Sequence, residues 1–230
     1  MEYLVTMTTH VPSGTPDAAV DDIRARESAH TRELAAQGRV LRLWRPPLAP
    51  GEWRTLGLFT AADADELERV LASMPLRVWR SDEVKQLTAH ANDPDPAASP
   101  QSAGSGEPAG SGEAPASGEA TAEFLVTFTP AVPAGTPERD VAQATAREAV
   151  RARELGRQGR LIRLWALPAD HGVSSALGLW RAGSEAELRA ILESLPQYPY
   201  LTTRTTPLTP HPSDPAAPGS RPLPVERTRT

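Results

Sequence analysis

The chain of 230 residues contains 24 prolines and 16 glycines but only 5% aromatic residues, so one packed core cannot include its whole length. The formal net charge of −5 provides no positive field for nucleic acid or an anionic membrane, and the absence of cysteine excludes disulfides, thiolate nucleophiles and cysteine-bound metals. Because no apolar run approaches the roughly 20 residues of a spanning helix and no leader pattern opens the chain, we expect a cytoplasmic protein that binds neither nucleic acid nor membranes.

An internal duplication organises the chain. Residues 2–94 align without a gap with residues 123–215 at a constant offset of 121, and roughly two positions in five are identical, far more than chance provides. The stretch between the copies contains no large apolar residue, so burial cannot offset the entropy lost on ordering it. We therefore predict a first copy at 1–91, a flexible linker at 92–122, a second copy at 123–206, and a Pro-rich tail at 207–230 that is unfolded or lies over a surface.

The first copy contains the signals of six elements in the order βαββαβ. Residues 3–8 are β-branched and aromatic, as in a strand, and a Pro/Gly loop follows them. Thr15 and Pro16 are typical of a helix start, and Gly38 of a helix end, because glycine readily adopts the left-handed conformation of a C-terminal cap. Two strands, a shorter helix opened by a capping box, and a last strand are predicted at 39–45, 53–60, 63–73 and 77–84.

This order of elements is typical of a ferredoxin-like α+β fold, in which two helices cover one face of a sheet and leave the other face bare. A bare apolar face needs a partner, which a second copy in the same chain can provide. We therefore expect two ferredoxin-like domains that form an intrachain pseudo-dimer of the dimeric α+β barrel type. The sequence leaves open a homo-oligomer of such chains.

A glutamate lies within the apolar stripe of the first helix in each copy. At about 100° per residue, Glu27 and His30 share a face with the apolar residues of that helix. Glu148 and Arg151 occupy the same positions in the second copy. An apolar setting favours the neutral carboxyl group, which raises its pKa toward the range that is useful for proton transfer near neutral pH.

The next strand of each copy carries an arginine and a tryptophan on one side, Arg42 with Trp44 and Arg163 with Trp165. Together they could bind a carboxylate and form an apolar wall for a small organic acid. Two alternatives stay open. The tryptophans can be core aromatics with the arginines as neighbours, or each arginine can form a buried ion pair with the helix glutamate, which then does no chemistry.

The remaining polar residues give no further motif. His90 and His211 recur near the end of each copy, where a lone histidine is typical of a surface residue. No histidine spacing is that of a metal site, and the sequence contains no phosphate loop, nucleophile elbow or nucleotide fingerprint. The residues therefore indicate neither a metal nor a cofactor.

The sequence resembles the muconolactone delta-isomerases, which are small single-domain proteins of the ferredoxin-like type. The likeness covers nearly all of both copies, and its pieces are Tyr3-Leu-Val-Thr-Met, Ala25-Arg-Glu27, Leu43-Trp44-Arg45, Leu195-Pro-Gln-Tyr-Pro-Tyr and His211-Pro212. The resemblance implies a proton shift on an unsaturated lactone without a metal or organic cofactor. It also implies that the helix glutamate is the acid and base, at Glu27 and Glu148.

Several polar positions depart from the family pattern. The family has a histidine where this chain has Arg42 and Arg163, and the arginine after the tryptophan is kept as Arg45 but replaced by Ala166 in the second copy. These changes alter the groups that would orient a lactone. Together with the duplication, they favour a role in a secondary-metabolite pathway.

Two functions of different classes follow. The first is a cofactor-independent isomerase, or a related cyclase, that moves a proton on a small unsaturated lactone, unsaturated acid or carbonyl compound. Its catalytic residues are Glu27 and Glu148, and its substrate-binding residues are Arg42, Trp44, Arg163, Trp165, His30 and Arg151. The alternative is a non-catalytic small-molecule-binding or scaffolding pseudo-dimer. The two are distinguished by whether the carboxylates face an open cavity or are closed against arginine.

Overall fold

The computed structural model describes residues 1–95, 121–169 and 172–217. These residues form two compact units. Of the described residues, 2–85 and 210–217 make up the N-terminal unit, and Met1 with the described residues of 86–209 makes up the C-terminal unit. Most of the predicted linker and the end of the predicted tail lie outside the described residues. Among the described helices, none combines the length and the apolar character needed to cross a bilayer.

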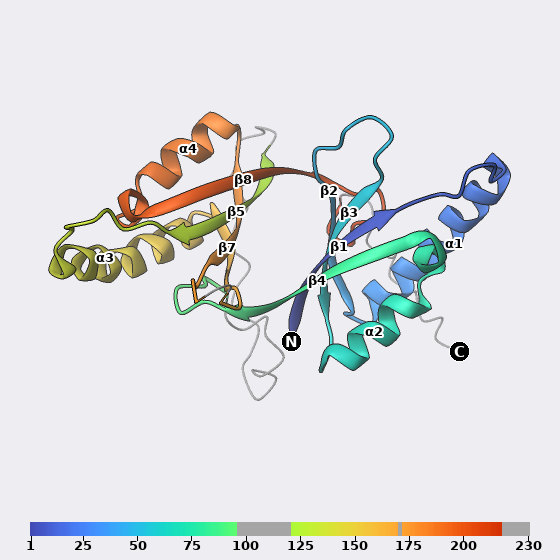
Figure 1. Cartoon of the computed structure of the whole chain (residues 1–230), viewed down its shortest axis with the longest axis horizontal. Helices are drawn as coiled ribbons and strands as arrows, with labels where there is room; N and C mark the ends of the chain where they lie inside the picture. Colours follow the sequence, from blue (N-terminus) through green and yellow to red (C-terminus); the bar gives the residue numbers. More distant parts are fainter. Residues whose placement is uncertain (96–120, 170–171, 218–230) are drawn as a thin grey trace, which may run out of the picture. The chain divides into compact units, whose positions relative to one another are not determined.

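The predicted order βαββαβ is confirmed in both copies, and Figure 1 labels the elements. The first copy contains β1 (Glu2–Thr9), α1 (Asp17–Ala36), β2 (Val40–Arg45), β3 (Arg54–Thr60), α2 (Ala64–Ser73), the 3₁₀ turn η1 (Pro75–Trp79) and β4 (Arg80–Ala89). The second copy contains β5 (Ala122–Pro130), α3 (Glu138–Arg157), β6 (Leu161–Ala166), β7 (Ala176–Ala182), α4 (Glu185–Glu193), η4 (Tyr198–Tyr200) and β8 (Leu201–Pro210). Both units are therefore ferredoxin-like α+β folds.

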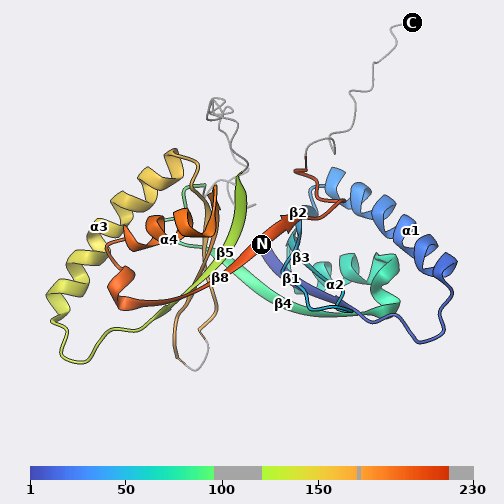
Figure 2. The same ribbon diagram turned by 90° about the horizontal axis from the view of Figure 1, so that it is seen from above.

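The strands of each unit pair antiparallel, with β3 between β1 and β2 and with β7 between β5 and β6. Strand β8 pairs along the other side of β5. Figure 2 shows that α1 and α2 lie together on one face of their sheet, and that α3 and α4 do so in the C-terminal unit. Each core is therefore the layer between the helices and one sheet face.

Along each strand, residues that face the helices alternate with residues that face the other side of the sheet, as the geometry of a strand requires. In the N-terminal unit, Tyr3, Val5 and Met7 of β1 pack with apolar residues of α1 and α2 in one buried cluster. Gly57 of β3 makes room for the aromatic ring of Phe59, because a Cβ at this glycine would overlap a carbon of that ring. In the second core, Gly178 makes room for the ring of Trp180 in the same way.

Local capping signals were predicted well in one place and wrongly in another. Asp63 caps α2 by accepting a hydrogen bond from the Glu66 amide at 2.7 Å, as the capping box predicts. Thr15 does not cap α1, because its hydroxyl donates to the Pro12 carbonyl at 2.7 Å and the helix begins after Pro16. The last strand begins later than predicted, because the 3₁₀ turn η1 precedes it.

Candidate functional site

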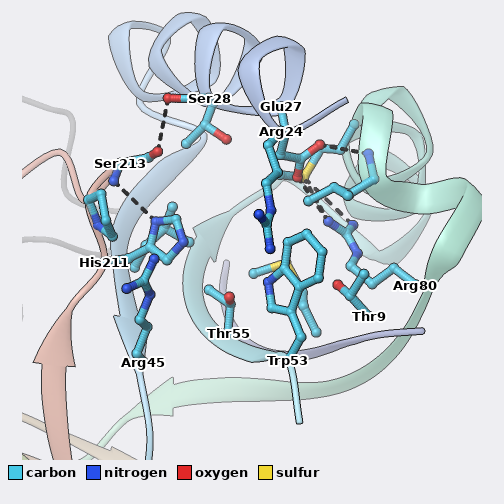
Figure 3. A pocket seen from close by; sticks show the side chains of 16 residues that line it. Thr9, Arg24, Glu27, Ser28, Arg45, Trp53, Thr55, Arg80, His211 and Ser213 are labelled. Atoms are coloured by element: carbon cyan, nitrogen blue, oxygen red, sulfur yellow. Dashed lines mark hydrogen bonds and ion pairs between the residues drawn. The ribbon is translucent and has the colours of Figure 1, made fainter. Parts of the chain in front are cut away.

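The N-terminal unit contains a cavity of about 390 Å³ next to α1, within the size range of small-molecule sites. Figure 3 shows its wall, where Glu27 contacts Arg80, while Arg24 lies beside Trp53 and Arg45 beside His211. These side chains come from α1, β2, the β2–β3 loop, β4 and the C-terminal segment. The sequence-predicted Glu27 therefore faces a cavity in a setting rich in guanidinium groups.

Two fixed donors hold the Glu27 carboxylate. Its Oε2 accepts a hydrogen bond from the Leu76 amide at 2.8 Å, and its Oε1 lies 3.2 Å from Nη1 of Arg80. The side chain is only 13% exposed. Burial is the largest influence on this carboxyl group and leaves its pKa raised, although the Leu76 amide and Arg80 act in the opposite direction. Glu27 is thus oriented and keeps an affinity for a proton.

Glu27 is not the only counterion of Arg80. The Arg80 guanidinium is 2% exposed, and its Nε lies 2.7 Å from Oδ1 of Asp82. Asp82 also pairs with Arg77 at 2.7 Å. Because Asp82 compensates the charge of Arg80, protonation of Glu27 does not leave a bare buried cation.

Arg45 and His211 form a second polar part of the wall. Burial first, and then the charge of Arg45, lower the pKa of His211 to about 4, so its imidazole is neutral near pH 7. Among the described residues, Arg45 has no hydrogen-bond or ion-pair partner, and its side chain is exposed. The guanidinium of Arg24 stacks on Trp53 at 4.4 Å from the ring centre. Arg24 also lies 3.8 Å from the exposed carboxylate of Asp21, so Arg45 is the guanidinium that is most available to an anionic ligand, and Arg24 can add a second contact.

A buried aspartate anchors the segment that carries His211. Asp214 is fully buried and accepts hydrogen bonds from Arg42 Nη2 and from the Leu43 amide, both at 3.1 Å. The His211 amide donates to the Leu43 carbonyl at 3.0 Å. The Arg42 guanidinium also lies 4.8 Å from the centre of the Trp44 ring. Arg42 thus holds this segment, and neither Arg42 nor Trp44 is part of the cavity wall.

The C-terminal unit repeats this anchor. Its buried carboxylate belongs to Asp93, which lies 3.1 Å from Nη2 of Arg163 and accepts a hydrogen bond from the Leu164 amide at 3.0 Å. Arg163 in turn stacks on Trp165 at 5.1 Å. The predicted ion pairs of Arg42 and Arg163 therefore exist, but their partners are aspartates from the C-terminal ends of the copies instead of the helix glutamates.

The other two predicted binding residues, His30 and Arg151, lie on the helices away from the cavities. His30 Nε2 is 2.9 Å from the Ser73 hydroxyl, and Arg151 Nη2 donates to Ser194 at the same distance. Neither lines a cavity. Each of these two side chains connects the first helix of its unit to the C-terminal end of the second helix of the same unit.

The C-terminal unit contains a cavity of the same volume, about 390 Å³, and Glu148 lines it. Glu148 Oε2 accepts a hydrogen bond from the Gln197 amide at 3.0 Å, the counterpart of the Leu76 contact. Burial raises the pKa of this carboxyl group. The position of Arg80 is held here by Leu201, so Glu148 has no arginine partner among the described residues. The two predicted glutamates are therefore placed alike but in different electrostatic settings.

Sequence reasoning missed Arg80 and misjudged the two histidines. Arg80 lies 53 residues from Glu27 in the sequence, so no helix or strand periodicity could indicate that the two side chains meet. His90 and His211 were interpreted as surface residues, yet each lines a cavity and is half-buried. The recurrence of histidine followed three residues later by aspartate at the end of both copies is the signal that could have found them.

The two units thus define α+β domains of the ferredoxin-like class, each with a helix glutamate at a cavity of small-molecule size. The chain belongs to the muconolactone delta-isomerase family, whose model matches residues 1–93 and 122–214. The resemblance inferred from the sequence is therefore confirmed for both copies.

Individual relatives agree with this family. The muconolactone delta-isomerase of Cupriavidus pinatubonensis is 34% identical over 90 residues, which are 39% of this chain and 95% of that protein. The enzyme of the same name from Acinetobacter baylyi is 29% identical over 39% of this chain and 91% of its own length. A heme-binding protein from Thermus thermophilus matches 93% of both chains with a TM-score of 0.52 at 11% identity, a likeness of fold alone.

Proposed function

We propose that the N-terminal unit isomerises a small unsaturated lactone that carries a carboxylate, and that Glu27 moves the proton. The observation that carries this proposal is the position of Glu27, a buried carboxylate that faces a cavity with two exposed guanidinium groups in its wall. The names of the relatives support the substrate class, since both are muconolactone delta-isomerases.

The proposed chemistry needs no redox partner. Ionised Glu27 removes a proton from a carbon that the lactone carbonyl acidifies, and the electron pair of the broken C–H bond delocalises into the conjugated enolate. The protonated carboxyl group then returns the proton to a different carbon of that system. The product is a double-bond isomer with the same atoms and the same number of electrons.

The surrounding residues have separate tasks in this mechanism. The Leu76 amide and Arg80 orient the Glu27 carboxylate, so the same group can accept and return the proton without reorganising. Arg45 and Arg24 bind the substrate carboxylate, because a charge-assisted contact is stronger than a neutral hydrogen bond. His211 stays neutral and adds no competing positive charge.

One observation favours a second candidate function. The ion pair between Glu27 and Arg80 resembles the structural pair that the sequence left open, and in that case the cavity only binds a small acidic ligand. A binding module would bind the ligand but convert none of it, with or without Glu27, whereas an enzyme would lose turnover when Glu27 is neutralised.

Glu27→Gln separates the two functions. It keeps the shape of the side chain but removes the proton acceptor, so we expect turnover of muconolactone to fall about 10²–10⁴-fold in a folded protein that still binds the substrate. Glu33→Gln is the matched control, because Glu33 lies on the same helix with a 68% exposed side chain. Undiminished turnover in folded Glu27→Gln, with loss in Glu148→Gln instead, would overturn the assignment to the N-terminal unit.

A further inference from the structure

The cavities of the two units have equal volumes but opposite wall chemistry. Three guanidinium positions of the N-terminal unit, at Arg24, Arg45 and Arg80, correspond to threonine, alanine and leucine in the C-terminal unit. Among the described residues that line the second cavity, none is an arginine or a lysine. The duplication has therefore produced two sites with different ligand requirements.

Other exchanges make the second wall apolar. Thr9 and Thr31 of the first cavity correspond to Pro130 and Ala152 of the second. The wall of the second cavity is built mainly from Phe128, Leu161, Leu164, Trp180, Leu195 and Leu201. Val132, which is 48% exposed, continues this lining to the surface. Such a wall stabilises a ligand by removing apolar surface from water.

The titratable groups of this wall oppose a negatively charged ligand. Glu148 has the Gln197 amide as its single hydrogen-bond partner among the described residues, and burial favours its neutral form. The described lining also contains the phenol of Tyr200 and the imidazole of His90, whose pKa is lowered, chiefly by burial, so that His90 carries no charge near pH 7. A carboxylate entering this cavity would lose its hydration without meeting a cation.

We infer that the cavity of the C-terminal unit binds an uncharged, largely apolar cyclic molecule that directs one hydrogen-bonding oxygen at Glu148. An ester or an unsaturated lactone without a carboxylate has this chemistry. This inference concerns the walls of a different cavity from that of the proposed isomerisation, so either can fail without the other.

Muconolactone methyl ester is a direct probe, because it differs from muconolactone by the loss of the negative charge. Calorimetric titration of the full chain with the ester should show saturable binding. Ala152→Leu, which fills the second cavity, should weaken this binding at least tenfold. Thr31→Leu is the matched change in the first cavity and should alter it less than twofold.

A gain of charge selectivity provides an independent test that does not depend on filling a core. Ala166→Arg restores the guanidinium that Arg45 supplies in the other unit, at a position that is partly exposed and tolerant of a long side chain. We expect the C-terminal unit of this variant to bind muconolactone itself at least tenfold more tightly than the C-terminal unit of the wild-type chain does, whether or not the N-terminal unit also binds it.

Three results would overturn the inference. The first is the absence of saturable ester binding to the full chain. The second is ester binding that survives Ala152→Leu and disappears in Thr31→Leu, which would place the ester in the first cavity. The third is an Ala166→Arg protein that is folded by circular dichroism and gains no affinity for muconolactone.

Discussion

Replacing Asp214 by alanine tests the anchor that brings His211 into the wall of the N-terminal cavity. The Asp214 side chain is completely buried, and it accepts hydrogen bonds from Arg42 and from the Leu43 amide. Removing one partner of a buried ion pair costs about 3–5 kcal/mol. Because the Arg42 side chain is 16% exposed and can regain some water, we expect a loss near the lower end, about 3 kcal/mol.

Urea unfolding followed by circular dichroism measures this loss, with Asp22→Ala as the control. Asp22 forms an exposed ion pair with Arg26 at 3.0 Å, which should contribute less than about 1 kcal/mol. Adding Arg42→Met to Asp214→Ala should restore part of the stability, because it removes the uncompensated charge. An Asp214→Ala protein as stable as the control, or a double variant without any recovery, would refute the reasoning.

The remaining predictions concern charge at the two cavities. The kcat/KM for muconolactone should rise with pH, because Glu27 must be ionised to accept a proton. Burial raises the pKa of Glu27, so the midpoint of a pH–rate profile should lie above 4.5, the ordinary pKa of a glutamate. The folded pKa of Glu148 is also raised, so the folded state binds more protons there and stability falls as pH rises through that pKa. Glu148→Gln should remove the contribution of this group and make the fall in stability shallower in urea unfolding measured across pH 4–7. Arg45→Ala should lower kcat/KM for muconolactone about 10- to 100-fold and leave the affinity for its methyl ester unchanged, since only the acid offers a charge-assisted contact.

The fold was largely predictable because its signals are local or repeated. The duplication is visible without gaps, and the strand alternation, the Asp63 cap and Gly38 lie within a few residues of the structure they determine. Glu27 was found for the same reason, since a carboxylate within an apolar helical stripe is conspicuous at a spacing of 3.6 residues.

The environment of the site was less predictable because it depends on distant residues. Arg42 was considered as a partner for Glu27, but it pairs with Asp214, which is 172 residues away in the predicted Pro-rich tail. The true partner, Arg80, follows a 3₁₀ turn that propensity did not indicate. Composition marks such a tail as unable to build a core, yet in its described part the buried Asp214 carboxylate and the His211 amide bind to β2.

Isomerisation of muconolactone in heavy water tests the central claim most directly. If Glu27 carries the proton and exchanges it with solvent between removal and return, the product should contain deuterium at the carbon that gains the proton. Nuclear magnetic resonance should detect this deuterium with the wild-type chain and with Glu33→Gln, and isomerisation and exchange should both be about 10²–10⁴-fold slower with folded Glu27→Gln. Wild-type rates of isomerisation and exchange in Glu27→Gln would contradict the account.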